Sequence, residues 1–506
     1  MKFREIMRDV EAVSIVGDAD IQGVAYDSRK VRPGFLFVAM RGEVNDGNRF
    51  TEAAVRAGAV AIVSESKDAT PHAGIALARV AHARKALARI SSNFYGRPAE
   101  KLKLTGVTGT NGKTTTTFVA EHILRSAGKS VAMIGTIEYH VAGRVIPALH
   151  TTPESLELNE MFDEAVRSSA GEGVMEVSSH ALEQARVYGL HFDVAVFTNL
   201  TRDHLDYHRT MEAYSASKRK LFESNSSAPP RVAVINGDDL FGRTLYETAK
   251  CSGSELVSYG LNPACNVTAE NIEYLPTGTR FRLRLEGKCV TCESRLLGEI
   301  NVYNVLAAAS AAFARGCTLE QIRNATASFQ RVPGRFELID CGQPFIVVVD
   351  YAHTDDALRN LARIARQLRD KQKTRGRIIT LFGCGGDRDR TKRPLMGRAA
   401  GEGSDFVVLT SDNPRSEDPQ AIIADALPGL LQTGTLHAVE PDRRKAIALA
   451  ISEAREGDIV LLAGKGHEKY QITREGTFPF EEVQIAKENL INQGYKTLVR
   501  QGAPVA

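Results

Sequence analysis

The fold of this chain is decided around one stretch, Leu104-Thr-Gly-Val-Thr-Gly-Thr-Asn-Gly-Lys-Thr-Thr-Thr-Thr117. Its first residues belong to a mainly apolar run, which predicts a strand. Gly109 and Gly112 predict a turn, and a helical pattern starts at Lys113-Thr114. Glycines let backbone N–H groups approach a phosphate, and the helix N-terminus adds favourable partial charge. In this arrangement Lys113 reaches the β- and γ-phosphates and the Thr114 hydroxyl ligates Mg²⁺. The stretch therefore predicts a nucleoside triphosphate site; the alternative is an ordinary glycine turn that opens a helix.

One position of the loop departs from the usual phosphate-binding pattern. That pattern has a glycine five positions before its second glycine, and here Val107 takes the place. We therefore interpret the loop as a variant in which Gly109 makes the early turn.

Composition is ordinary for a globular protein and argues against several classes. The length of 506 residues predicts about three domains. The formal net charge of +3, with no lysine/arginine block, argues against nucleic acid. No run of about eighteen apolar residues is present, so we expect no membrane insertion, and the N-terminal residues do not form a signal peptide. Seven scattered cysteines suit a reducing cytosol, and we interpret the lone Cys289-Val-Thr-Cys292 as strand residues.

Residues 1–98 form the first predicted unit, a small α/β domain. Phe35–Met40 is a compact apolar strand, Ala53–Ala61 is predicted as a helix and Val60–Ser64 as the next strand. Tyr95-Gly-Arg-Pro98 is a plausible linker.

Residues 99–334 form the second predicted unit, with a mostly parallel sheet. Two apolar runs in it end in polar clusters, which contain Glu176 and His204. In open α/β sheets ligands gather beyond the carboxyl ends of strands, and these side chains offer donor atoms suited to the Mg²⁺ of a triphosphate site. The alternative is a helix-capping or surface cluster.

Residues 335–506 form the third predicted unit. Four short apolar runs, each followed by polar residues, alternate with helical patterns and predict a parallel, Rossmann-like sheet that is covered on both faces. The runs begin at Ile346, Ile378, Phe406 and Ile459. Their polar ends form a chemically dense edge that we expect to face the glycine-rich loop across a cleft.

These motifs together resemble one family, the ATP-dependent Mur ligases of bacterial peptidoglycan synthesis. The resemblance runs over nearly the whole chain and explains the missing early glycine of the loop. Its segments are Asp27-Ser28-Arg29, Thr108–Thr115, His150–Pro153, Glu176–His180, Asp203–Asp206, Asn301/Asn304, Gly334–Glu337 and Asp350–His353. One departure is Thr354-Asp355-Asp356, where the family usually has Thr-Pro-Asp.

Within the family the chain is most similar to members that add the third residue of the stem peptide. The resemblance implies that ATP phosphorylates the D-glutamate carboxylate of UDP-N-acetylmuramoyl-L-Ala-D-Glu, and that an amine then attacks the acyl phosphate. It also implies Mg²⁺ as cofactor and a cytoplasmic, monomeric enzyme whose partners are its substrates, the UDP-muramoyl dipeptide and an amino acid.

The resemblance assigns site residues by position. The implied ATP site is Gly109, Thr110, Asn111, Gly112, Lys113, Thr114, Thr115, Asn301, Arg335 and Asp350. The implied catalytic residues are Lys113, Lys218, Glu176 and His204, and the implied metal ligands are Thr114, Glu176, His204 and Lys218 as a carbamate. The resemblance favours Lys218; the alternatives are that it is a solvated helix lysine or that the neighbouring Lys220 takes this place. The implied dipeptide site is Ser28, Thr151, Thr152, Ser178, Gln184 and Arg186, although the residues around Ser28, taken alone, favour a turn.

The incoming amino acid is predicted to be meso-diaminopimelate. The implied pocket is Arg388, Asp412, Asn413, Pro414, Arg415, Gly464 and Glu468. An arginine offers bidentate hydrogen bonds to the second carboxylate, which distinguishes this amino acid from lysine, and Glu468 is expected to pair with the distal ammonium. Two alternatives stay open: a folylpolyglutamate synthase, and a P-loop ATPase or binding protein without ligase activity.

Overall fold

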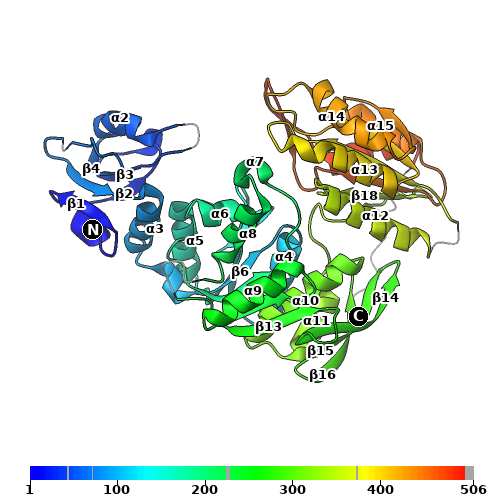
Figure 1. Ribbon diagram of the computed structural model, residues 1–506, viewed down its shortest axis with the longest axis horizontal. Helices are drawn as coiled ribbons and strands as arrows, with labels where there is room; N and C mark the ends of the chain where they lie inside the picture. The colour runs from blue at the N-terminus through cyan, green and yellow to red at the C-terminus, as the bar shows by residue number, and fades with distance from the viewer. Residues whose placement is uncertain (43–44, 71, 224–227, 372–373, 496–506) are drawn as a thin grey trace.

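The computed structural model describes residues 1–42, 45–70, 72–223, 228–371 and 374–495. The predicted three-domain α/β fold is confirmed: each domain is built around its own sheet, and the N- and C-terminal domains lie on opposite sides of the central one (Figure 1). The division of the chain at residues 98 and 334 stays a prediction, and the last part of the third unit, 496–506, lies outside the described residues. No helix in the described ranges is long and apolar enough to cross a membrane.

The N-terminal domain has a five-stranded sheet in the order β1-β5-β4-β3-β2, with β1 antiparallel at one edge. Its strands are β1 (Ala12–Val16), β2 (Gly23–Ala25), β3 (Phe35–Ala39), β4 (Ala59–Ser64) and β5 (Ala76–Val80). Helices α1 (Phe3–Ile6) and α3 (Ala83–Phe94) pack on one face, and α2 (Thr51–Arg56) packs on the other. The predicted helix over Ala53–Ala61 is wrong at its end, because Gly58 adopts φ +100° and ends the helix before β4.

The central domain has an eleven-stranded sheet in the order β16-β15-β14-β13-β12-β11-β6-β10-β7-β8-β9. Its strands are β6 (Lys103–Thr108), β7 (Val131–Ile134), β8 (Glu138–Val141), β9 (Arg144–Pro147), β10 (Glu172–Glu176), β11 (Phe192–Phe197), β12 (Val232–Asn236), β13 (Glu255–Gly260), β14 (Val267–Leu275), β15 (Gly278–Leu285) and β16 (Lys288–Ser294). In the spatial order of the sheet, the strands from β14 through β6 to β7 run parallel. Antiparallel hairpins, β15–β16 at one edge and β8–β9 at the other, extend it. The interpretation of Cys289 and Cys292 as strand residues is confirmed, since both lie in β16.

Helices cover both faces of the central sheet because its strands are apolar on both sides. Helices α4 (Lys113–Ser126), α10 (Glu299–Ala314) and α11 (Leu319–Ser328) share one buried core with the strands. Helices α5 (Ser155–Arg167) and α9 (Leu240–Cys251) share the other. The glycine-rich loop joins β6, in the middle of this sheet, to α4, so a rigid scaffold holds it.

The C-terminal domain has a six-stranded sheet in the order β17-β18-β22-β19-β20-β21. Its strands are β17 (Glu337–Ile339), β18 (Ile346–Asp350), β19 (Ile378–Cys384), β20 (Phe406–Ser411), β21 (Leu436–Val439) and β22 (Ile459–Ala463). All pairs are parallel except β17–β18. Helices α12 (Asp355–Arg369), α13 (Arg393–Gly403) and α14 (Pro419–Leu431) cover one face, and α15 (Arg443–Ser452) and α16 (Glu482–Asn492) cover the other. The predicted covering of both faces is therefore confirmed.

Candidate active site

The glycine-rich loop is shaped so that only glycine fits at its two turning positions. Gly109 has φ +150°, and a Cβ there would lie 1.8 Å from Thr198 Oγ1. Gly112 has φ +86°, and a Cβ there would lie 2.3 Å from Asn304 Oδ1. The loop is thus pressed against the end of β11 and against α10, with backbone N–H groups of the α4 N-terminus at its mouth.

Lys113 folds back over the loop. Its Nζ donates to the carbonyl oxygens of Gly109 at 2.9 Å and Thr110 at 2.8 Å. Burial lowers the pKa of this ammonium, although the nearby carboxylates of Glu176 and Asp203 act in the opposite direction. The lysine is therefore held where it would meet the phosphates of a nucleotide in the loop.

Glu176 ends β10 beside the first turn of α4. Its side chain is fully buried, and one carboxylate oxygen accepts hydrogen bonds from Thr114 Oγ1 at 3.1 Å and Thr136 Oγ1 at 3.0 Å. The other accepts from the Thr136 backbone N–H at 2.7 Å. The structure thus brings together two of the predicted metal ligands, Thr114 and Glu176. It adds Thr136, which the sequence did not single out.

Lys218 lies on α8 (Met211–Arg219) and points at the same loop. It is 1% exposed, and its Nζ donates to Gly109 O at 2.8 Å and lies 4.3 Å from the centre of the Tyr214 ring. Burial lowers the pKa of Lys218 well below its usual range, and the charge of Lys113 adds to this effect. Lys220, in contrast, is partly exposed and pairs with Glu183 at 2.6 Å. Of the two lysines, Lys218 is the one next to the glycine-rich loop.

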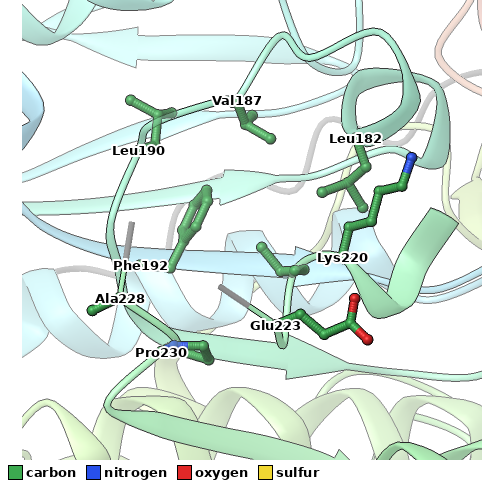
Figure 2. Close-up of a pocket in the computed structure, with 9 residues that line it drawn as sticks. Leu182, Val187, Leu190, Phe192, Lys220, Glu223, Ala228 and Pro230 are labelled. Atoms are coloured by element: carbon green, nitrogen blue, oxygen red, sulfur yellow. The ribbon is translucent and has the colours of Figure 1, made fainter. Parts of the chain in front are cut away.

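A small pocket near Lys220 is not a ligand site. Figure 2 shows its apolar lining, which includes Val187 and Phe192, with the Lys220 nitrogen pointing away from them. Its volume is about 10 Å³, room for no more than about one water molecule.

His204 lies in the loop after β11, at the N-terminus of α7 (Leu205–His208), in a left-handed conformation with φ 54°. Its Nε2 lies 3.3 Å from Asp203 Oδ2. Burial lowers the pKa of His204 to about 3, which favours a neutral imidazole with a lone pair free for a metal ion. Asp203 also lies 3.7 Å from Lys392 and 4.0 Å from His353, two side chains of the C-terminal domain.

A cleft of about 860 Å³ separates the central and C-terminal domains, within the size range of small-molecule sites. Predicted residues from both domains line it: Thr151, His204, Arg388, Asp412, Asn413, Arg415, Gly464 and Glu468. The polar edge of the C-terminal sheet therefore does face the central domain across a cleft.

Three of the predicted nucleotide contacts surround the mouth of the loop. Arg335 donates from Nη2 to Thr114 Oγ1 at 3.3 Å, and its guanidinium lies over the Tyr351 ring at 4.6 Å. Asn301 accepts from Asn304, the residue behind Gly112, at 2.9 Å. Asp350 instead binds backbone: its carboxylate accepts from the N–H groups of residues 336 and 352 at 2.7 and 2.8 Å. In this structure Asp350 fixes the segment that carries Arg335.

The loop also contacts the C-terminal domain directly. Asn111 Nδ2 donates to Asp356 Oδ2 at 2.8 Å. Asp356 belongs to Thr354-Asp355-Asp356, the segment that departs from the family pattern. The side chain of Thr354 still caps α12, accepting from the Ala357 N–H at 3.2 Å.

The predicted dipeptide contacts form one connected group next to Glu176, apart from Ser28. Arg186 donates to Thr152 O at 2.7 Å and to Gln184 Oε1 at 2.8 Å. Thr152 in turn accepts from the Ser178 N–H at 3.1 Å, and Thr151 accepts from Thr136 at 3.1 Å. Ser28 lies in the N-terminal domain, and the described lining of the cleft comes only from residues 136–483.

The predicted amino-acid pocket is a network at the ends of β20 and β22. Asn413 Nδ2 donates to Glu468 Oε2 at 2.9 Å. Arg415 adopts φ 53°, and its Nη1 donates to Gly386 O at 2.7 Å. The backbone of Pro414 packs directly against Gly386, where a Cβ would lie 1.9 Å from the Pro414 carbonyl oxygen. Arg388, on the neighbouring loop, is exposed.

The residues at the loop fit a Mg²⁺ ion. Among the described residues no group of three or more His, Cys, Asp and Glu side chains forms a self-sufficient metal site. Mg²⁺ usually takes one or two carboxylates and completes its shell with phosphates and water. The adjacent oxygens of Thr114 and Glu176 provide such a partial shell beside the phosphate-binding loop.

The fold and the loop define an α/β P-loop protein of three domains. Family models match the three domains in turn: "Mur ligase family, catalytic domain" over residues 20–95, "Mur ligase middle domain" over 107–312 and "Mur ligase, glutamate ligase domain" over 334–466.

Relatives of known name agree with these matches. A protein from Solibacter usitatus, named UDP-N-acetylmuramoyl-L-alanyl-D-glutamate–2,6-diaminopimelate ligase, is 53% identical over 480 residues and covers 95% of each chain. One of the same name from Caldanaerobacter subterraneus is 44% identical over 94% of this chain and 95% of its own. A solved structure with that name is 34% identical, with a TM-score of 0.65, over 94% of this chain and 96% of its own. The chain belongs to the Mur ligase family.

More distant structures share the fold alone. A Thermotoga maritima MurF ligase in complex with ADP has a TM-score of 0.62 at 19% identity, covering 93% of this chain and 97% of its own. A Mycobacterium tuberculosis folylpolyglutamate synthase has a TM-score of 0.61 at 18% identity and covers 74% of this chain and 91% of its own.

Several site residues escaped the sequence reasoning. Thr136 binds Glu176, Lys392 approaches Asp203, and Lys465 contacts Asp412 of the amino-acid pocket. Thr136 and Lys392 belong to no sequence motif that indicates a binding site. Lys465 lies within the Gly464–Glu468 segment, where a lysine between two predicted pocket residues was the available signal.

Proposed function

We propose that this protein is an ATP-dependent ligase that adds meso-2,6-diaminopimelate to UDP-N-acetylmuramoyl-L-alanyl-D-glutamate in peptidoglycan precursor synthesis. The relatives named above carry this activity in their names. The observation that carries the proposal is the cleft, because Thr136 and His204 of the central domain line it opposite arginine and carboxylate side chains of the C-terminal domain. Glu176 joins Thr136 to Thr114 of the phosphate-binding loop. We call the central-domain side of the cleft, with the adjacent phosphate-binding loop, the first wall, and the C-terminal side the second wall. An enzyme that activates one substrate with ATP and joins it to a charged amino acid needs both.

The chemistry follows from the two walls. The D-glutamate carboxylate attacks the γ-phosphorus of ATP, ADP leaves, and an acyl phosphate forms. The α-amine of diaminopimelate then attacks the acyl carbon and forms a C–N bond. The C–O bond to the phosphoryl group breaks, phosphate leaves with the former carboxylate oxygen, and the amine gives up a proton. A carboxylate by itself is a poor electrophile, whereas phosphate is a good leaving group. We propose that Lys113 stabilises the negative charge that develops between ATP and the carboxylate during phosphoryl transfer.

We propose that Thr114, Glu176 and His204 hold Mg²⁺, which supplies charge neutralisation for the phosphoryl transfer. Lys218 fits the carbamate role, because burial lowers the pKa of this amine and so favours its uncharged, nucleophilic form. Reaction of this amine with CO₂ forms the N–C bond of a carbamate and releases one proton. The resulting anion would stand beside Lys113.

We assign the second carboxylate of diaminopimelate to Arg415 and Arg388, and its distal ammonium to Glu468 and Asp412. The dipeptide would lie along Thr151, Thr152, Ser178, Gln184 and Arg186, with Ser28 of the N-terminal domain at the uridine. We also propose that the enzyme works as a monomer in the cytoplasm, where ATP is available.

One assay separates this function from its two rivals. Phosphate release is measured with ATP and UDP-muramoyl dipeptide, adding diaminopimelate, lysine or no amine. The proposed ligase releases phosphate in stoichiometric amounts with diaminopimelate only. An amine-independent ATPase releases it in all three mixtures. A folylpolyglutamate synthase releases it in none, but does so with a folate and glutamate.

A further inference from the structure

Lys465 follows β22 and lies behind the residues that line the amino-acid pocket, closed to solvent. Its side chain is 0% exposed. The ammonium contacts Asn413 Oδ1 at 2.6 Å, Tyr470 O at 2.9 Å, Asp412 Oδ1 at 3.2 Å and Glu468 Oε2 at 3.4 Å. A buried ammonium is costly unless charges and acceptors surround it, so these contacts are what keep it there.

Three of the four partners belong to the pocket proposed for the amino acid. Asp412 and Asn413 follow β20, whereas Glu468 follows β22, and β19 lies between these two strands. One lysine therefore joins two loops that the sheet itself does not pair.

Lys465 and the backbone of Ile472 together fix the orientation of the Asn413 amide. Asn413 Oδ1 accepts from the Lys465 ammonium and from the Ile472 N–H at 2.9 Å. The amide nitrogen is then left to donate to Glu468 Oε2 at 2.9 Å. Glu468 is thus held by two donors from one side, and it lines the cleft.

The charges around Lys465 are shared unevenly. Arg443 and Glu482, both 0% exposed, pair with each other at 2.8 Å. Lys465 is then shared between two carboxylates, the buried Asp412 and the half-buried Glu468. With the half-buried Arg415, whose charge also acts on both carboxylates, these six side chains carry three negative and three positive charges. The pocket therefore suits a group that carries an ammonium and a carboxylate together, with the ammonium at the two carboxylates and the carboxylate at Arg415.

We propose that Lys465 is a specificity-determining positioning residue: it fixes Asn413, Asp412 and Glu468 as a receptor for the distal ammonium of the incoming amino acid. This inference rests on the proposed function. Lys465 itself faces away from the substrate, since its four contacts are all to protein groups and it is closed to solvent.

The test compares two amines with the same carbon chain and both carboxylates, diaminopimelate and 2-aminopimelate, which lacks the distal amine. In the unsubstituted enzyme we expect kcat/KM to favour diaminopimelate by about tenfold to a hundredfold, the range for a charge-assisted hydrogen bond. Lys465→Met should lower kcat/KM for diaminopimelate until this preference falls to about twofold. The KM values of ATP and the dipeptide should stay within about twofold, because their sites lie on the other wall.

Two further variants keep the test decisive if Lys465→Met folds poorly. Lys465→Gln keeps a donor to Asn413 but removes the charge, and should also lose the preference. Arg393→Met removes another fully buried cation of the same domain, which pairs with Glu417 and Asp425, and should lower stability while leaving the preference unchanged.

The possible outcomes are distinct. If Lys465→Gln keeps the full preference, or if the Lys465 variants slow both amines equally, Lys465 is structural only and the inference is wrong. If the unsubstituted enzyme uses neither amine, the proposed function itself fails.

Discussion

Buried lysines lie in both domains that border the cleft, but the groups that hold them differ. Lys113 and Lys218 donate to backbone carbonyl oxygens of the glycine-rich loop, and in the described part of the chain neither forms an ion pair with a carboxylate. Lys465 on the opposite wall contacts two carboxylates and an amide oxygen. The lysines of the first wall are thus held by backbone oxygens, with the carboxylates of Glu176 and Asp203 further away, whereas the lysine of the second wall is held by acidic side chains.

This difference indicates what each wall receives. An ammonium that has no ion-paired carboxylate can pair with an incoming phosphate or carboxylate, whereas two carboxylates that share one lysine can pair with an incoming ammonium. The pocket of Lys465 also shows arginines, Arg388 and Arg415, at its open side, so an anion and a cation can bind side by side. An amino acid with a second carboxylate and a second ammonium matches that pattern.

The largest effect is expected from Lys113→Ala. Loss of the lysine would leave the charge that develops during phosphoryl transfer without a partner, so kcat should fall by about a thousandfold. Steady-state kinetics with saturating ATP measure it. A variant that keeps more than about a tenth of kcat would contradict the role given to the first wall, because phosphoryl transfer would then not depend on the charge of Lys113.

A smaller but chemically more specific loss is expected from Lys218→Ala, about a hundredfold in activity. Added bicarbonate or short carboxylic acids should restore part of it, since they replace a carbamate anion near Lys113. Lys220→Ala is the matched control and should stay within about twofold of the unsubstituted enzyme, because its ammonium is partly exposed and pairs with Glu183. Full activity of Lys218→Ala would contradict the carbamate.

Arg415→Ala tests the second wall. The KM for diaminopimelate should rise by about tenfold to a hundredfold, because charge-assisted hydrogen bonds to its second carboxylate are lost. The KM for ATP should change by less than about twofold. Arg398→Ala, an exposed arginine of α13, is the control. Equal rises in both KM values would mean that the two walls do not act separately.

The smallest effect concerns the shape of the loop. Gly112→Ala and Gly128→Ala both place a Cβ on a left-handed backbone, with φ +86° and +82°, which costs about 1–2 kcal/mol of folding stability. Only at Gly112 does that Cβ meet an atom, Asn304 Oδ1 at 2.3 Å, whereas nothing lies within 4 Å at Gly128. Denaturant unfolding should therefore show a larger loss for Gly112→Ala, together with weaker ATP binding. Equal losses would mean that backbone strain, and not contact with α10, fixes the loop.

Much of this arrangement was predictable because it is local in the chain. The strand, loop and helix around Gly109 follow from glycine, apolar residues and a Lys-Thr pair within one stretch. The four polar strand ends of the C-terminal domain were predicted in the same way, because parallel strands bring their carboxyl ends to one edge. The helix after Ala53 was predicted too long, since the pattern could not show that Gly58 adopts a left-handed conformation.

Other features depended on residues far apart in the sequence. The choice of Lys218 over Lys220 required knowing which face of α8 meets the loop 109 residues earlier. The approach of Lys392 to Asp203 and of Asn111 to Asp356 joins two domains, and no periodicity or spacing carries that information.

The sequence by itself therefore determined the kinds of chemistry present: a phosphate-binding loop, three α/β domains, and a set of acidic and basic residues that follow apolar strands. These depend on backbone conformation and hydrophobic patterning over short distances. Only the tertiary structure decided which charges share a buried space. It left Lys113 and Lys218 without an ion-paired carboxylate among the described residues and surrounded Lys465 with acidic partners, because burial and charge pairing depend on distance in space rather than on distance along the chain.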